Sequence, residues 1–408
     1  MILGVDLGAP ATVVAALRDG VPEGPIPTRA PGGVRPAAVW GTPVRAVCVA
    51  VDLDTVRLAP VAAIRVGGPC PPALGPLTGW PEGAGRAVVV RGGHSLTGRP
   101  VAELDSAAVA EFAAGCGLTD FAVTATGSPV LAEHELAVAE IVAAEVPGAR
   151  ITLSYEFGQV GLRERENSAI LNAALGPYAD DLAARLGRDL PGVPLFFART
   201  GSGLVSAHYF RRYPLVCYLG AFTCALRGGA TLAGLSDTAV QERRPATCDR
   251  RAAAPGVGRT GGEGAAATAV RTGMVTGGLP RTGARSDLPV RVNLPLPLTV
   301  EADTGVAVGP LAGEAGPGWT VPGRAELAVA YGAALAAPVA EVERIVQARG
   351  RAELDRALDD ARDEALTRVV SAGAAPGSAR VAATTVNPLS YLPDGLYRVR
   401  VTAEGATP

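Results

Sequence analysis

The chain has 408 residues, including 52 Gly and 34 Pro, and all 37 of its basic residues are arginine. The absence of lysine excludes a Schiff-base lysine, a P-loop lysine and a Ser-Lys dyad. A formal net charge of −2 gives no general attraction to nucleic acid or to an anionic membrane, so neither is expected as a partner.

Targeting signals and cysteine spacing both favour a cytoplasmic protein. The N-terminal segment MILGVDLGAP carries an acidic residue in its first apolar run and lacks the basic start of a signal peptide. The sequence contains no apolar run of about 18 residues, the length that a membrane span needs. The six cysteines are scattered without CxxC pairs, which disfavours zinc-ribbon and thioredoxin-type sites.

The first part of the chain predicts an α/β core. Residues 2–6 and 11–18 form a predicted β-hairpin around a turn at Gly8, Ala9 and Pro10. Strand-like runs within 44–66 follow, and helices and strands alternate from residue 105. The alternating elements are a helix over 107–116, a strand over 121–126, a helix from an N-cap at Ser128 to about Val146, a strand over 151–156, helices over 164–175 and 177–187, and strands over 194–198 and 215–219.

Residues 238–286 break this pattern. Within these 49 residues there are only six large apolar residues, and eight arginines stand against three acids. Because no period of 2 or 3.6 survives, we expect a disordered or loosely attached segment. A nucleic-acid-binding patch is the disfavoured alternative, since no aromatic residue is interleaved for base stacking. A stretch of GC-rich DNA read out of frame would give the same composition.

Regular structure is predicted again near residue 324. Residues 324–350 predict a helix interrupted at Pro338, and 351–373 predict a cleaner amphipathic helix. Its expected buried stripe comprises Leu354, Leu358, Ala361, Ala365 and Val369. Two strands, over 380–386 and 396–403, close the chain.

The segment LSYEFGQVGLRERENSAILNAAL (153–175) resembles the hydantoinase A/oxoprolinase family. Flanking segments resemble it in the same order, among them GGHSLTGRPVAELD (92–105), YLGAFTCALRGGATLAGLSD (218–237) and NPLSYLPDGLYRVRVTAEG (387–405). The resemblance implies an α/β fold of ribonuclease H-like, actin/hexokinase-like ATPase domains, here with an incomplete second half. It also implies ATP and Mg²⁺ as cofactors, a small cyclic amide such as a hydantoin or oxoproline as substrate, and a second hydantoinase-type subunit as partner.

The same resemblance assigns candidate nucleotide-binding residues. The family's first phosphate hairpin reads Asp-x-Gly-Gly-Thr, and this chain keeps Asp6 and Gly8 but has Pro10 at the Thr position, without an N–H donor. A second Asp-x-Gly-Gly-Thr hairpin, expected near residue 240, is absent. Arg227 and Gly228 are a further candidate for anion contact, because glycine allows close backbone approach beside a permanent cation. The alternative for these two residues is an ordinary strand-to-helix turn.

Arg165, Glu166 and Asn167 are the candidate catalytic residues by resemblance. They lie at the start of a predicted helix, so the alternatives are helix caps or a solvated run of charges over 163–166. His94, His134 and His208 lack ligand-like spacing, and His134 falls on the expected polar side of its helix, so metal ligands are left unidentified.

The sequence divides into four expected regions: an N-terminal-like domain over 1–176, the start of a core domain over 177–237, the low-complexity segment over 238–323, and a C-terminal portion over 324–408. One hypothesis for function is ATP-dependent ring opening of a cyclic amide. The other is a catalytically inactive pseudoenzyme or partner subunit of the same fold.

Overall fold

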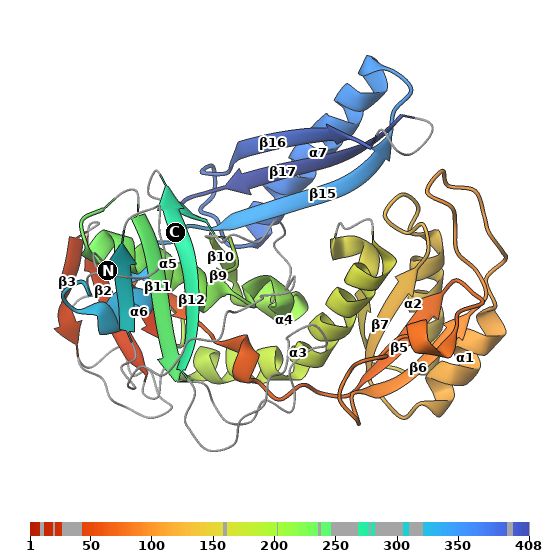
Figure 1. The fold of residues 1–408 in the computed structure, drawn as a ribbon, viewed down its shortest axis with the longest axis horizontal. Helices are drawn as coiled ribbons and strands as arrows, with labels where there is room; N and C mark the ends of the chain where they lie inside the picture. The colour runs from red at the N-terminus through yellow and green to blue at the C-terminus, as the bar shows by residue number, and fades with distance from the viewer. Residues whose placement is uncertain are drawn as a thin grey trace.

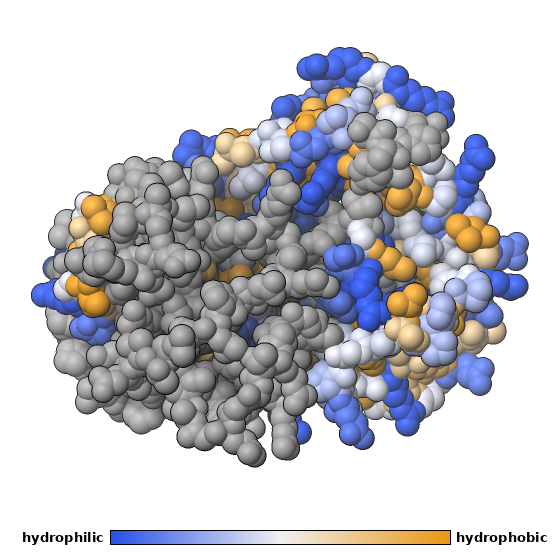
Figure 2. Space-filling model, viewed as in Figure 1, coloured by the Kyte–Doolittle hydropathy of each residue, from blue (hydrophilic) through white to orange (hydrophobic). Residues whose placement is uncertain are grey.

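The computed structural model describes residues 1–8, 12–18, 21–26, 43–157, 161–201, 203–235, 238–245, 268–276, 279–281, 305–309, 321–389 and 395–407. Figure 1 shows two α/β bodies joined by one long helix, α3 (Leu162–Asp189), with a smaller antiparallel unit above them. In Figure 2 hydrophilic residues cover the outer end of this smaller unit, at the top of the view.

The first sheet has the strand order β10-β9-β4-β1-β2-β3. Its strands are β1 (Ile2–Asp6), β2 (Val13–Arg18), β3 (Val21–Ile26), β4 (Ala46–Ala50), β9 (Leu195–Arg199) and β10 (Gly203–Ser206). The predicted hairpin is confirmed, because β1 and β2 pair antiparallel, while β4 pairs parallel with both β1 and β9. Every residue of β4 is buried, as expected for a parallel strand covered on both faces.

Helices cover both faces of this sheet. The C-terminal half of α3 packs on one face through residues such as Leu175 and Leu182. α5 (Gly220–Leu232) and α6 (Ala328–Ala334) pack on the other. A Cβ at Gly4 would lie 1.7 Å from the Ala330 carbonyl oxygen, so α6 lies directly against β1 and only glycine fits there.

The second sheet is entirely parallel, with the order β6-β5-β7-β8. Its strands are β5 (Val61–Val66), β6 (Gly85–Val90), β7 (Asp120–Ala125) and β8 (Arg150–Leu153). α1 (Ser106–Gly115) and α2 (Glu133–Glu145) pack on one face, through Val109, Val138 and Val142. The N-terminal half of α3 and the 67–84 loop cover the other face. α3 therefore contributes to the cores of both bodies.

The third sheet, β15-β17-β16, is antiparallel. It consists of β15 (Val339–Gln347), β16 (Arg380–Pro388) and β17 (Leu396–Glu404), and α7 (Arg351–Ser371) covers one face. The predicted stripe of α7 is confirmed, with Leu354 half-buried and the other four residues buried. At the far end of this unit Ile345, Leu389 and Leu396 pack with Leu96 and Val130 of the second body.

Part of the stretch expected to lack regular structure forms strands. β11 (Thr238–Pro245), β12 (Thr268–Thr276), β13 (Leu279–Arg281) and β14 (Gly305–Gly309) make a sheet of order β13-β12-β11-β14. The expectation of disorder is wrong for these strands, which pair by backbone hydrogen bonds that need no apolar period. All the pairings described in this sheet are antiparallel, unlike the β1–β4 pair of the first sheet. The rest of 238–323, apart from 321–323, lies outside the described residues.

Three predicted element boundaries are wrong. α2 begins at Glu133 rather than after Ser128, because 127–131 form a turn closed by N–H groups of Val130 and Leu131 on the Gly127 carbonyl. The two helices expected on either side of residue 176 are one continuous helix, α3, with Pro177 inside it. β8 ends at Leu153 and is followed by the short helix η3 (Ser154–Phe157).

Two predicted element types are also wrong. Residues 215–219 belong to a short helix η4 (Pro214–Cys217) and the approach to α5, after α4 (Ala207–Arg212), instead of a strand. This apolar segment, 214–232, is long enough to cross a membrane, but 78% of it is buried in the core. Residues 339–347 form strand β15 instead of continuing a helix, because Ala340 and Val342 face inward on alternate positions and β17 pairs along their length.

Candidate functional site

The first candidate site lies at the carboxyl ends of β1 and β4. Asp6 ends β1, is 4% exposed, and its Oδ1 accepts the Gly8 N–H at 2.9 Å. The Leu7 N–H donates to the carbonyl of Ala50, the last residue of β4. The parallel pairing therefore places the Asp6 carboxylate where the two strands end together, and Gly8 turns the chain beside it. Residues 9–11 lie outside the described residues.

A second acid, Asp52, lies just beyond β4 at the same edge. Its Oδ1 accepts the Asp54 N–H at 3.2 Å and caps the short helix η1 (Leu53–Thr55). Burial raises the pKa of Tyr178 and raises that of Tyr218 to about 12, and the charge of Asp52 contributes to both shifts. Both phenols therefore stay protonated as donors near this carboxylate. Asp52 is not among the sequence-predicted site residues, although its place just after a buried strand, in the segment CVAVDLDT, is the local signal for it.

The oxygen atoms at this edge are of the type that Mg²⁺ takes as ligands. Asp6 and Asp52 both present carboxylates, and the hard cation Mg²⁺ is usually held by one or two carboxylates together with water and phosphate oxygens. These two residues are therefore the ones that would hold the ion. Among the described residues there is no group of three or more His, Cys, Asp or Glu side chains arranged to hold a metal alone.

Arg227 and Gly228 lie inside helix α5, so the expected strand-to-helix turn is wrong. Arg227 is buried, and its Nη1 donates to the Gly332 carbonyl at 3.3 Å. A Cβ at Gly228 would lie 1.8 Å from the Ala328 carbonyl oxygen. The close backbone approach that glycine permits at this position is thus an approach to helix α6. Nucleotide contact by these two residues stays a prediction.

Glu166 forms a buried ion pair with Arg65 of β5. Arg65 Nε donates to Glu166 Oε1 at 2.7 Å, and Nη2 donates to Oε2, with both side chains almost fully buried. Arg65 Nη1 also donates to the Leu74 carbonyl at 2.7 Å and contacts Cys70 Sγ at 3.0 Å. Glu166 is therefore part of an internal network that joins α3, the sheet and the 67–84 loop, rather than of a solvated charge run.

Arg165 enters a second buried network. It is 1% exposed, and its Nη2 donates to the Ala125 carbonyl at 2.8 Å and to Ser128 Oγ at 3.3 Å. Glu135 is 0% exposed and accepts hydrogen bonds from Ala125 N–H at 2.9 Å and Ser154 Oγ at 2.6 Å. Burial lowers the pKa of Arg165 to about 10 and raises that of Glu135, which these hydrogen bonds oppose. The expectation that this side of α2 faces solvent is therefore wrong for Glu135, which is fully buried.

Asn167 completes the set of candidate catalytic residues, and its Oδ1 accepts the Trp80 Nε1–H at 3.2 Å. The neighbouring Arg163 donates to the carbonyls of Leu74, Gly75 and Thr78. The structure thus brings Arg165, Glu166 and Asn167 together at the start of α3, over the second sheet. Asp6 and Gly8 lie at the edge of the first sheet.

Two of the three histidines form a pair that their sequence spacing did not predict. The rings of His94 and His134 have centroids 4.3 Å apart, and His134 Nδ1 accepts the Gly93 N–H at 2.8 Å. His94 is 4% exposed and follows β6, in the segment GGHSLTG. His208 lies exposed on α4. The pair was missed because 40 positions separate its members, although the two glycines before His94 mark a tight turn.

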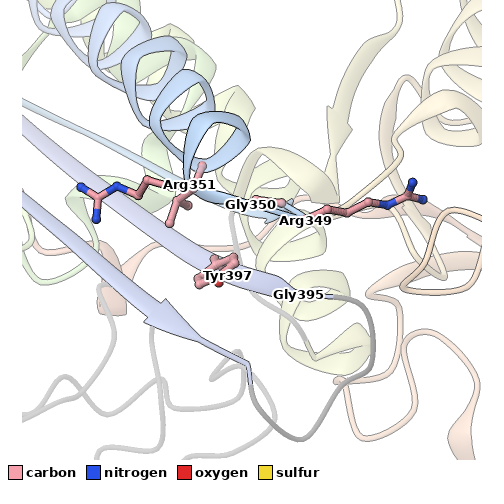
Figure 3. A pocket seen from close by; sticks show the side chains of 7 residues that line it. Arg349, Gly350, Arg351, Gly395 and Tyr397 are labelled. Atoms are coloured by element: carbon pink, nitrogen blue, oxygen red, sulfur yellow. The ribbon is translucent and has the colours of Figure 1, made fainter.

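A groove of about 660 Å³ lies where α7 begins beside β17. It is lined by Ala348, Arg349, Gly350, Arg351, Leu354, Gly395 and Tyr397. Figure 3 shows that the side chains of Arg349 and Arg351 point in opposite directions. They do not converge on one ligand, so the groove adds no cation pair to the candidate site.

Together, the hairpin-led mixed sheet and the second, parallel sheet define an α/β fold. The fold is similar to that of ATP-dependent caprolactamase from Pseudomonas jessenii, with a TM-score of 0.63 and 11% identity over 99% of this chain and 87% of that chain. It is also similar to nucleotide-free acetone carboxylase, with a TM-score of 0.59 and 11% identity over 100% and 88% of the two chains. The sequence matches no family model and no curated protein. The predicted hydantoinase/oxoprolinase type of fold is confirmed by these two structures.

Proposed function

We propose that the chain is an ATP-dependent enzyme that opens the ring of a small cyclic amide. The observation that carries the proposal is the Asp6–Gly8 turn, in which a buried carboxylate stands where the parallel strands β1 and β4 end. Two proteins with similar folds are named for ATP-dependent reactions, a caprolactamase and an acetone carboxylase. At this edge backbone N–H groups and a carboxylate-held cation can bind phosphate oxygens without any lysine.

In this proposal the two sheets have different tasks. Asp6 and Asp52 hold Mg²⁺, and the Gly8 turn lies next to the nucleotide phosphates. Arg165, Glu166 and Asn167 position the start of α3 against the second body, since each is hydrogen-bonded to it. Arg227 and Gly228 hold α5 against α6. Residence in the cytoplasm and pairing with a second hydantoinase-type subunit belong to the same proposal.

The alternative is a pseudoenzyme or partner subunit of this fold. Two observations favour it: Pro10 supplies no N–H at the Thr position of the first hairpin, and β11 is followed by no second Asp-x-Gly-Gly-Thr sequence. The described strands β11 and β14 also pair antiparallel, where the first sheet has its parallel β1–β4 pair. Such a protein would keep its packing and lose phosphate chemistry.

Calorimetric titration of the full chain with ATP in the presence of Mg²⁺ tests the proposal. We expect micromolar binding, weakened at least about tenfold in Asp6→Asn, which corresponds to about 1.4 kcal/mol. Asparagine keeps the acceptor for Gly8 N–H, so this variant should fold. Asp105→Asn, at the cap of α1 on the other body, is the matched control and should bind normally. Absence of ATP binding would overturn the proposal.

Turnover separates the two candidate functions. Wild-type protein that binds ATP is assayed for ADP release with oxoproline, hydantoin and a simple lactam. Release that depends on one of these cyclic amides, and that is lost in Asp6→Asn, supports the enzyme. Binding of ATP with no release under any of them, also when a candidate partner subunit is added, supports the pseudoenzyme.

A further inference from the structure

The second sheet has the topology that creates a ligand-binding crevice. Its order β6-β5-β7-β8 is that of a doubly wound sheet in which the chain first moves to one side of β5 and then to the other. The 67–84 connection therefore runs over one face, while α1 and α2 lie on the opposite face. Ligands of such sheets bind outside the carboxyl ends of the strands at this switch point. Here the switch point lies between the ends of β5 and β7.

Three glycine-containing turns meet at this point. Gly67 follows β5, Gly92 and Gly93 follow β6, and Gly127 follows β7, all at φ values between 75° and 148°. Thr126 lies among them, because a Cβ on Gly93 would come 1.9 Å from its Oγ1 and one on Gly67 would come 3.0 Å from it. The backbone is thus drawn in tightly around a hydroxyl at the switch point.

Two buried polar atoms at this point have no hydrogen-bond partner among the residues that the structure describes. They are Thr126 Oγ1 and His94 Nδ1. The backbone N–H of His94 donates to the Thr126 carbonyl at 3.0 Å, so the two residues are adjacent. Buried polar atoms are nearly always paired, and an unpaired one costs about 1–3 kcal/mol. A ligand that paired with both atoms would remove this cost.

The start of α2 adds donors to the same place. His134 lies in the first turn of this 13-residue helix, and its ring is the one that meets His94. The N-cap residue, Ala132, offers no side-chain acceptor to the first-turn N–H groups. These N–H groups and the helix dipole favour negative charge at this end.

From these observations we propose that the switch point between β5 and β7 is a binding site for a small oxyanion of the carboxylate or phosphate class, held by His94, His134 and Thr126. The groups are donors or can become donors by protonation, and no carboxylate is hydrogen-bonded to either imidazole among the described residues. His94 belongs to the 91–101 loop, which follows β6 and is held by backbone hydrogen bonds such as that from Val101 N–H to the Gly93 carbonyl at 2.9 Å.

The charges around the pair are consistent with uptake of an anion together with a proton. On α2, Glu133 is exposed and Glu135 is engaged with Ala125 and Ser154. On α3, Arg165 interacts with the charge of Glu135. In the 91–101 loop, Arg91 and Arg99 are exposed. Burial, followed by the neighbouring His94, lowers the pKa of His134. A bound anion opposes both effects, so binding should tighten as the pH falls.

The test uses nitrogen-15 NMR of the imidazoles, which is simple because the chain has only three histidines. Inorganic phosphate and acetate are titrated separately into the full-length protein at constant ionic strength. We expect saturable shifts of His94 and His134 with at least one of them, a rise in the pKa of His134, and no shift of the exposed His208. Response to phosphate alone assigns the phosphate class, and response to acetate alone assigns the carboxylate class.

Variants tie the response to the proposed residues. His94→Gln and Thr126→Val should each weaken the anion about tenfold, while Thr152→Val, in the neighbouring strand of the same sheet, should leave it unchanged. Asp6→Asn should also keep the response, so failure of the nucleotide proposal is separable from failure of this one. Shifts that His208 shares equally, or no saturable shift with either anion in the wild-type protein, would overturn the proposal.

Discussion

The two parallel sheet edges of this protein are built from similar parts and finished differently. At the end of β1 and β4, the polar side chains accept hydrogen bonds from nearby backbone. Asp6 accepts from the Gly8 N–H, and Asp52 accepts from the Asp54 N–H. At the end of β5 and β7, Thr126 Oγ1 and His94 Nδ1 are buried and have no hydrogen-bond partner within the described part of the chain. The first edge has its turns organised in advance, whereas the second needs a bound group to complete its hydrogen bonding.

The largest expected effect concerns the ion pair that supports the second edge. Glu166→Ala leaves Arg65 buried and unpaired, so the free energy of unfolding should fall by about 3–5 kcal/mol. Urea denaturation followed by circular dichroism measures this. Glu164→Ala, at an exposed position of the same helix turn, should change it by less than about 0.5 kcal/mol. A further Arg65→Met substitution should restore much of the loss; equal stability of all variants would contradict the buried pair.

A smaller effect is expected where the glycine turns of the second edge meet. Gly127→Ala places a Cβ 2.3 Å from the His94 carbonyl oxygen, at a φ of 75°. Gly148→Ala, at a φ of 83°, meets nothing within 4 Å and is the matched control. Both variants pay about 1–2 kcal/mol for left-handed backbone. Gly127→Ala should lose about 2 kcal/mol more, by thermal or urea unfolding, because its neighbours must shift. Equal losses would mean that the turn is loosely packed.

The hydrogen bond between Trp80 and Asn167 should contribute about 1 kcal/mol. Asn167→Ala is expected to reduce the free energy of unfolding by that amount and to leave ATP affinity unchanged. Asn172→Ala is a useful comparison, because its amide bridges Thr152 and the Arg212 carbonyl in a more deeply buried place and should cost more. A change in kcat of Asn167→Ala without any loss of stability would instead support a catalytic role.

The smallest expected effect is a pH dependence of the free energy of unfolding that comes from His134 of the histidine pair. Burial lowers the pKa of His134 below its ordinary value, so the unfolded chain binds this proton first. The stability that the neutral ring provides is therefore present above about pH 6.5 and is lost as the pH falls through the folded pKa. His134→Gln keeps an acceptor for Gly93 N–H but does not titrate. The urea midpoint of the wild-type protein should therefore fall relative to that of His134→Gln between about pH 7 and about pH 5. A difference that stays constant over this range would contradict the prediction.

The sequence predicted the elements whose signal is local. The hairpin at the N-terminus has its turn residues between two apolar runs, and the α7 stripe repeats with helical spacing. The fold class followed from the resemblance over 153–175; residues 162–175 of this segment lie in α3, which packs in both bodies. Residues 339–347 were misassigned because their alternation was read as the continuation of an apolar helix, and strand pairing with β17 decided otherwise.

The candidate sites were less predictable, because they depend on contacts between distant segments. Asp6 could be placed from its position after a strand, but the pairing of His94 with His134 follows from the parallel register of β5, β6 and β7. The partners of Glu166 and Asn167, Arg65 and Trp80, lie 101 and 87 residues away. Residue type and spacing alone could not separate these internal contacts from a catalytic role.

The continuous helix α3 has a consequence for how the two bodies can move. It spans Leu162–Asp189, about 42 Å at 1.5 Å per residue, and each half belongs to a different core. Such a helix couples the two bodies mechanically, so rotation or bending of one body is transmitted along the helix to the other. A chain cut at residue 176 would leave each fragment with half of α3 and an exposed apolar stripe. The two bodies are therefore expected to fold together and to be inherited together.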